Sequence, residues 1–301
     1  MIHVNNFSSG ALNPVLAYLM SCMGCFLGLR CTTRARAYQG AARARWLTMA
    51  AVAIGSTGIW VMHFIAMLGF SIPGQSIRYN VPVTILSMVI AVVVVGIGTF
   101  IVGFREGTGA LVLGGVIIGL GVASMHYIGM SAIRVQDSLS YNPMLVAASV
   151  IIAIIAGTAA LWAALRLHSL LSTIVASLIM GVAVSGMHYT GMAALRVYPA
   201  PGLTVNTSAT ASALAFLLPL ILGLSMVGFI FSTVIALSPT AAEIMEEGEL
   251  MARIAGTSRY EPSVGPGRQT SPVNSANPDP AQPGAARPGS LFRPHPSQRR
   301  P

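Results

Sequence analysis

Three related stretches decide the fold: Met62-His63-Phe64-Ile65-Ala66-Met67, Met125-His126-Tyr127-Ile128-Gly129-Met130 and Met187-His188-Tyr189-Thr190-Gly191-Met192. Their histidines are 63 and 62 residues apart, so the motif recurs at a nearly constant period. Such a period predicts one structural unit repeated three times. Each motif also closes a long apolar run, which predicts that it lies near the end of a helix.

The chain outside the motifs is strongly apolar, with 54% hydrophobic and only 8% charged residues. This composition leaves too little polar surface for a soluble domain and indicates a protein of the lipid bilayer. Seven apolar segments each have about the length that a helix needs to cross a membrane. They are 12–30, 47–70, 82–104, 110–133, 144–165, 170–195 and 212–237.

The motif period contains two of these segments, so the repeating unit is predicted to be a two-helix hairpin. Three odd-numbered segments also begin in step, at Asn13-Pro14, Asn80-Val81-Pro82 and Asn142-Pro143, and proline in the first turn is a helix-start signal. A unit that crosses twice returns to the same side, so the copies share one orientation. We therefore predict an all-α membrane protein with seven transmembrane helices, built from three parallel two-helix repeats plus one extra helix. Its three motifs lie at one depth and converge.

Arginine provides all 17 basic residues, and lysine is absent. The absence of lysine excludes retinal and pyridoxal Schiff bases and the lysine of a phosphate-binding loop. Five arginines between residues 30 and 45 dominate one side of the predicted spans, whereas the other side has only Arg78, Arg134 and Arg196. The positive-inside rule then predicts a multi-pass plasma-membrane protein with residues 1–11 outside and the C-terminus in the cytoplasm. The net charge of +9 thus reflects topology and does not indicate nucleic-acid binding.

The composition changes after the seventh segment. Residues 239–301 contain 11 of the 18 prolines and no long apolar run, which predicts a disordered cytoplasmic tail. The acidic stretch Glu243–Glu249 is expected to extend the last helix by a turn or two. No catalytic motif follows residue 238, so the sequence predicts a membrane domain at 12–238 that is not an enzyme.

The motif supplies a soft, uncharged donor set. Each histidine is four residues before a methionine, which places imidazole and thioether on one helix face. This set suits Cu(I), Cu(II) less well, and calcium or magnesium poorly; only Glu106 and Asp137 are acidic within residues 1–238. Three histidines could also hold zinc, and a pair could ligate haem. A single such histidine would suggest packing, but three at one period favour function because ionisable groups in a bilayer are costly.

Residues beside the histidines have two interpretations each. Tyr127 and Tyr189 either belong to an interfacial aromatic belt or hydrogen-bond a metal ligand or a bound diatomic gas as a supporting cofactor contact. Gly129 and Gly191 permit close approach of helices.

Other polar residues near the spans are expected to be structural. Arg134 and Arg196 are predicted to continue the motif helices and anchor them at the membrane surface. Cys22 and Cys25 have the CxxC spacing of redox and metal sites, but without a second pair they indicate packing.

Residues 10–238 resemble the bacterial MHYT sensor domain, since the motif recurs three times over seven spans and its third copy reads Met187-His188-Tyr189-Thr190 in full. The resemblance implies an integral membrane sensory domain that binds copper through the motif and senses oxygen, carbon monoxide or nitric oxide. The implied ligands are Met62, His63, Met67, Met125, His126, Met130, Met187, His188 and Met192.

Members of this family are frequently joined to cyclic di-GMP enzymes, histidine kinases or DNA-binding domains, whereas here only the predicted tail follows. The signal is therefore expected to pass to an unidentified cytoplasmic partner. The alternatives are a copper transporter or chaperone, a haem b electron-transfer protein and a membrane scaffold.

Overall fold

The computed structural model describes residues 4–167, 169–199, 209–237, 248–251 and 253–254. The chain divides into two compact units, Met1–Leu250 and Met251–Pro301, and the helices of interest belong to the first. The predicted tail, including most of Glu243–Glu249, lies outside the described residues apart from a few helical positions near residue 250.

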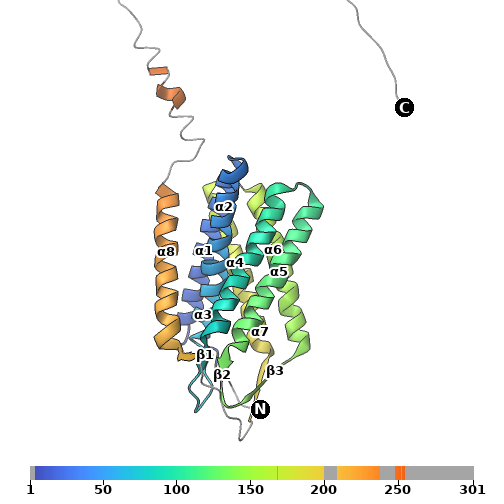
Figure 1. Ribbon diagram of the computed structural model, residues 1–301, viewed down its shortest axis with the longest axis vertical. Coiled ribbons are helices and arrows are strands. Elements are labelled where there is room, and N and C mark those ends of the chain that lie inside the picture. The colour runs from blue at the N-terminus through green and yellow to red at the C-terminus, as the bar shows by residue number, and fades with distance from the viewer. Residues whose placement is uncertain (1–3, 168, 200–208, 238–247, 252, 255–301) are drawn as a thin grey trace, which may run out of the picture. The chain divides into compact units, whose positions relative to one another are not determined.

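Within the described residues, seven helices are long and apolar enough to cross a membrane, which agrees with the predicted number of spans. They stand side by side, with the short strands gathered at one end (Figure 1). The second span is a composite of three consecutive elements, and the last one follows a short π-helical segment. The bounds are α1 Leu12–Arg36, α2 Gly40–Val52, η1 Ala53–Val61, α3 Met62–Met67, α4 Val81–Phe104, α5 Thr108–Ser131, α6 Pro143–Arg166, α7 Leu170–Ala194, η2 Ala213–Leu217 and α8 Leu218–Leu237.

The composite second span is the centre of the bundle. In the most apolar stretch of this span, 89% of the residues are buried, whereas the corresponding shares are 22% in α6 and 18% in the last span. Large apolar side chains such as Ile155 of α6 and Phe229 of α8 remain exposed, as expected for surfaces that face lipid. The element η1, immediately before the first motif, is a π-helix of nine residues. Such segments are rare and often occur at functional sites.

Asparagine and proline start the third and fifth spans, α4 and α6, as predicted. The side chain of Asn80 accepts a hydrogen bond from the Val83 amide at 3.0 Å, and that of Asn142 accepts one from the Met144 amide at 2.9 Å. These contacts satisfy backbone donors that the first turn leaves free. Pro143 is the first residue of α6, where a missing N–H costs nothing.

The predicted boundaries of the first connection were wrong. We expected the arginines from 30 to 45 to lie between spans, but α1 continues to Arg36 and α2 begins at Gly40. Arginine is a good helix former, and its long stem reaches polar surroundings from a helix. The Arg36 guanidinium donates to the backbone carbonyls of Leu165 and Leu167 at 2.7 and 3.1 Å and to that of Ala164. Arg36 therefore supplies hydrogen-bond donors to the backbone carbonyls at the C-terminal end of α6.

The expectation of an all-α protein also needs correction, because five short strands form two small sheets in the part of the chain that the structure describes. The strands are β1 Arg78–Asn80, β2 Ile133–Arg134, β3 Ser138–Tyr141, β4 Leu195–Tyr198 and β5 Thr210–Ser212. Antiparallel pairing gives the order β2-β1-β5 in one sheet and joins β3 to β4 in the other.

Arg134 and Arg196 consequently lie in strands and do not continue the motif helices, which end at Ser131 and Ala194. Their backbone carbonyl and amide groups pair with strands in other connections between spans. This pairing is favoured over a continuation of the motif helices. The sheets thus join the connections between spans at the end of the bundle where the motifs lie.

Candidate metal centre

The three motif histidines meet at one point in the bundle. His63 comes from α3, His126 from α5 and His188 from α7, and all three side chains are buried. Their Nδ1 atoms are separated by 3.0 Å between His63 and His188, 3.2 Å between His63 and His126 and 3.3 Å between His126 and His188. We call these residues the histidine triad. The predicted convergence of the motif histidines is confirmed.

Whichever tautomers the three neutral imidazoles adopt, the triad cannot form hydrogen bonds at all three of its Nδ1 contacts. Each contact joins two Nδ1 atoms, so it needs one nitrogen with a proton and one without. Among three mutually close nitrogens, two must be in the same state. At least one pair then opposes two lone pairs or two N–H groups, and a buried unsatisfied polar group is costly. A cation shared by the three lone pairs removes this conflict.

The triad has dimensions close to those of a trigonal metal site. The point equidistant from its three Nδ1 atoms lies about 1.8 Å from each, slightly less than metal–imidazole distances of about 2.0–2.1 Å. A small outward movement of the rings would provide the normal distance. Among the described residues, the triad is the group of three or more histidine, cysteine or acidic side chains that could hold a metal ion. The donor set therefore fits copper, as the family resemblance implies, and also zinc.

Glycines of neighbouring motifs form the walls behind two of the rings. A Cβ atom added to Gly129 would lie 2.7 Å from Nε2 of His63, and one added to Gly191 would collide with Nε2 of His126. Each ring thus packs against the motif glycine of the following copy. The sequence predicted that these glycines permit close helix approach, and the structure shows that the approaching group is a histidine ring.

The six motif methionines are buried in the core cluster around the triad, with exposed fractions of 2% or less. The second methionine of each motif follows its histidine by one helical turn on the same face. The structure brings the histidine nitrogens to ligand spacing, whereas metal binding by the thioethers stays a prediction. The methionines concerned are Met62, Met67, Met125, Met130, Met187 and Met192.

The aromatic residue that follows each histidine packs against it edge-on. The ring centroids are 4.7 Å apart for His63 and Phe64, and the two tyrosine copies have 4.8 and 5.0 Å. The phenol of Tyr127 shares a 2.7 Å hydrogen bond with the Ser149 hydroxyl of α6, and the ring of Tyr189 stacks on Phe7 at 5.6 Å. These contacts support the histidine rings from the side, whereas hydrogen bonding to a metal ligand stays a prediction for both tyrosines.

Two further tyrosines lie on the strands beside the motifs. Burial raises the pKa of Tyr79 in β1, and burial with nearby Tyr127 raises the pKa of Tyr141 in β3 to about 12. The ring centroid of Tyr79 is 6.0 Å from that of Phe64, and that of Tyr141 is 5.7 Å from that of Tyr127. Both phenols therefore stay uncharged at physiological pH and add no negative charge beside the motifs.

The three cysteines and Trp60 are buried, and the packing role expected for Cys22 and Cys25 stays a prediction. Cys22, Cys25 and Cys31 are buried free thiols. The Trp60 indole donates to the Ser87 hydroxyl at 3.0 Å and thereby joins η1 to α4. Sequence reasoning missed this bond and the π-helix, because a serine in an apolar run does not reveal its partner.

The chain matches the family model MHYT, described as a bacterial signalling protein N-terminal repeat, at residues 57–115 and 119–177. Each matched copy begins shortly before a motif histidine, so the match contains the first two motifs. The third motif lies beyond the matched residues, and the parallel arrangement of three hairpins stays a prediction. No solved structure matches the chain.

Curated relatives are similar to the membrane region. The bifunctional diguanylate cyclase/cyclic di-GMP phosphodiesterase MucR of Pseudomonas aeruginosa is 43% identical over 155 residues, which cover 50% of this chain and 22% of the relative. The cyclic di-GMP phosphodiesterase NbdA of the same organism is 37% identical over 206 residues, covering 66% of this chain and 26% of the relative. The signaling protein YkoW of Bacillus subtilis is 32% identical over 191 residues, covering 60% and 23%. The chain thus spans about a quarter of the length of these relatives.

Proposed function

The chain belongs to the MHYT repeat family of bacterial signalling proteins, and on this premise we propose that it is a membrane sensor whose input site is a metal ion held by the histidine triad. The observation that carries the proposal is the set of three buried Nδ1 atoms within 3.0–3.3 Å of one another, which cannot satisfy one another by hydrogen bonding alone.

Copper is the proposed metal. Imidazole is a good ligand for it, and the methionines of the surrounding core offer soft donors that calcium or magnesium would not use. A bound copper ion would supply a redox-active centre that can take a small additional ligand such as oxygen, carbon monoxide or nitric oxide. Zinc remains the main competitor because three histidines also suit it.

Axial haem ligation is disfavoured by the same geometry. The two axial nitrogens of a haem lie on opposite faces of a flat macrocycle, about 4 Å apart. The three Nδ1 atoms are closer, at 3.0–3.3 Å, and their rings are buried against one another and against glycines. A macrocycle would need this core to separate, so we do not favour the haem alternative.

The triad couples three spans, because each ring comes from a different one. A change in charge or ligation there alters the preferred separation of α3, α5 and α7. The element α3 continues directly from η1, and α8 packs against both η1 and α1. A shift at the triad can thus reach the last helix through packed elements, provided that the stimulus has different affinities for two arrangements.

The proposed output is cytoplasmic signalling. MucR and NbdA are named for making or degrading cyclic di-GMP, and the present chain aligns with about a quarter of each. We therefore propose a plasma-membrane location with the N-terminus outside, and an as yet unidentified cytoplasmic partner that changes the cellular level of cyclic di-GMP. The membrane region itself is proposed to be non-enzymatic.

Metal titration tests the input site. Purified protein would be titrated with Cu(I) and, separately, with zinc against competing chelators, and compared with His63→Ala, His126→Ala and His188→Ala. His168→Ala is the matched control, since His168 lies outside the three motifs. The proposal expects one tightly held copper ion per chain in the parent and the control, and at least a hundredfold weaker binding in each triad variant. Equal binding by all variants, or none by the parent, would contradict it.

Signalling is tested in cells. Cyclic di-GMP would be measured while copper is supplied and withdrawn, in cells that express the parent, His126→Ala or no copy of the chain. The proposal expects a copper-dependent change only with the parent. A response that is the same without the chain would refute the output arm and leave the metal site standing.

A further inference from the structure

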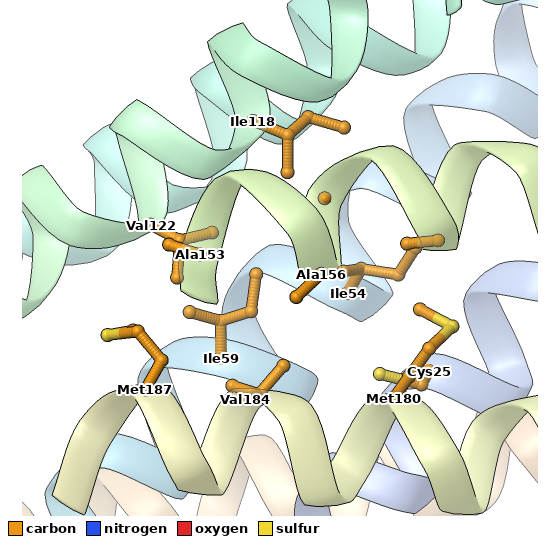
Figure 2. A pocket seen from close by; sticks show the side chains of 12 residues that line it. Cys25, Ile54, Ile59, Ile118, Val122, Ala153, Ala156, Met180, Val184 and Met187 are labelled. Carbon is orange, nitrogen blue, oxygen red and sulfur yellow. The ribbon is translucent and has the colours of Figure 1, made fainter. Parts of the chain in front are cut away.

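A small cavity lies within the bundle, on the side of the triad away from the strands. Its volume is about 40 Å³, and η1, α5, α6 and α7 form most of its walls, with Cys25 of α1 completing them (Figure 2). The lining residues are Cys25, Ile54, Ile59, Ile118, Val122, Ala153, Ala156, Gly157, Ala160, Met180, Val184 and Met187.

The cavity lies directly below the triad in the repeat pattern. Three of its lining residues, Ile59, Val122 and Val184, each come four residues before a motif histidine. Four residues are about one helical turn, so each side chain lies on the same face as its histidine and roughly 6 Å further along the span. The same three spans therefore form both the triad and the cavity wall, although the π-helical geometry of η1 changes the local rise for Ile59.

The lining excludes ions and does not favour water. None of the twelve side chains carries a charge, a hydroxyl or an amide, and the heteroatoms present are the sulfurs of Cys25, Met180 and Met187. A water needs two to four polar partners to remain in a buried space, and comparable apolar cavities stay dry and take up xenon or benzene. By the same measure of volume one water needs about 10–15 Å³, so 40 Å³ accommodates a molecule larger than water but smaller than benzene.

We propose that this cavity is a binding site for a small apolar molecule of the size of a diatomic gas. Apolar gases dissolve better in the hydrocarbon interior of a membrane than in water, so the site lies in the phase that already concentrates them. The physiological meaning of this cavity, one helical turn from the triad, rests on the proposed function. A gas molecule held there would be next to the metal centre before it binds.

Occupancy would also bear on the packing of the motif helices. Ile59 on η1 and Met187 on α7 both line the space, and each is close in sequence to a triad histidine (Figure 2). A guest improves the contacts of side chains that face empty space, because a void forfeits dispersion energy. Filling the cavity therefore favours the arrangement in which these walls hold their present separation.

Xenon is the direct probe, because it is apolar, of similar size and visible by anomalous X-ray scattering. Crystals of the parent would be pressurised with xenon and compared with crystals of Ala156→Leu, which adds three carbons from the α6 wall. Ala159→Leu is the matched control, since Ala159 is exposed on the outer face of the same helix. Val184→Phe fills the space from α7 and provides a second blocked variant should Ala156→Leu fail to fold.

The proposal expects a xenon peak between η1, α6 and α7 in the parent and in Ala159→Leu, and at least a tenfold lower occupancy in either blocked variant. A parent without xenon in the cavity, or a blocked variant with undiminished xenon there, would overturn it. Copper content would be measured on the same preparations. A copper-loaded parent without xenon would reject the cavity alone, whereas xenon binding without copper would reject the metal centre alone.

Discussion

Because the ring of His126 packs against Gly191, position 191 of the third motif has too little room for a side chain. In Gly191→Ala the added Cβ would lie 2.9 Å from Cδ2 and 3.2 Å from Cε1 of His126, and still closer to Nε2. Ordinary van der Waals contact begins at about 3.4 Å, so the ring must move by several tenths of an ångström. It cannot do so freely, because its Nδ1 is only 3.2 and 3.3 Å from the other two rings. Overpacking of this kind costs about 1–3 kcal/mol.

The variant should therefore lose both stability and metal affinity. We expect a lower Tm in detergent and copper binding that is about 10–100-fold weaker, the usual effect of disturbing the support of a metal ligand. Gly186→Ala on the same helix is the control, because a Cβ there meets nothing within 4 Å and alanine is the better helix former. The reasoning would be refuted if Gly191→Ala were as stable as Gly186→Ala and bound copper equally well.

Three further substitutions test contacts around the triad and at the other end of the bundle. Ser149→Ala removes the 2.7 Å bond to Tyr127 and should cost about 0.5–1.5 kcal/mol in thermal unfolding, whereas Ser124→Ala, which loses only a bond within its own helix, should be nearly neutral. Phe64→Tyr adds a hydroxyl to a fully buried ring and should destabilise the protein by about 1–3 kcal/mol; a wild-type Tm would contradict this. Arg36→Gln removes the bonds to the C-terminal carbonyls of α6 and should cost about 1–3 kcal/mol, and unchanged unfolding would disprove that role.

The sequence predicted the spans and the convergence of the triad because both depend on period. Apolar length identifies a spanning helix, and a motif that recurs every two spans returns to one depth. These rules required no knowledge of neighbours. They located His63, His126 and His188 together before any contact was known.

Other features depend on pairing between segments far apart in the chain. The strand at 78–80 pairs with 133–134 and 210–212, and such short strands have no periodic pattern of their own. The bond between Tyr127 and Ser149 and the seat of His126 on Gly191 likewise join different spans. Glycine in the motif indicated close approach, but the residue that approaches was decided by packing.

The cavity illustrates the same limit. Isoleucine, valine and alanine on apolar helices predict a filled core as readily as a void. Only the relative placement of η1, α6 and α7 leaves the space near Ala156 unfilled. In retrospect, the aliphatic residue four positions before each histidine was a signal that could have indicated a shared layer.

X-ray absorption at the copper edge of the copper-loaded parent tests the central claim most directly. The account predicts a first shell that contains three imidazole nitrogens at about 2.0 Å, and the loss of that shell in His63→Ala/His126→Ala/His188→Ala. The His168→Ala control should retain it. A first shell made of sulfur alone, or a nitrogen shell that survives in the triple variant, would contradict the assignment of the metal to the histidine triad.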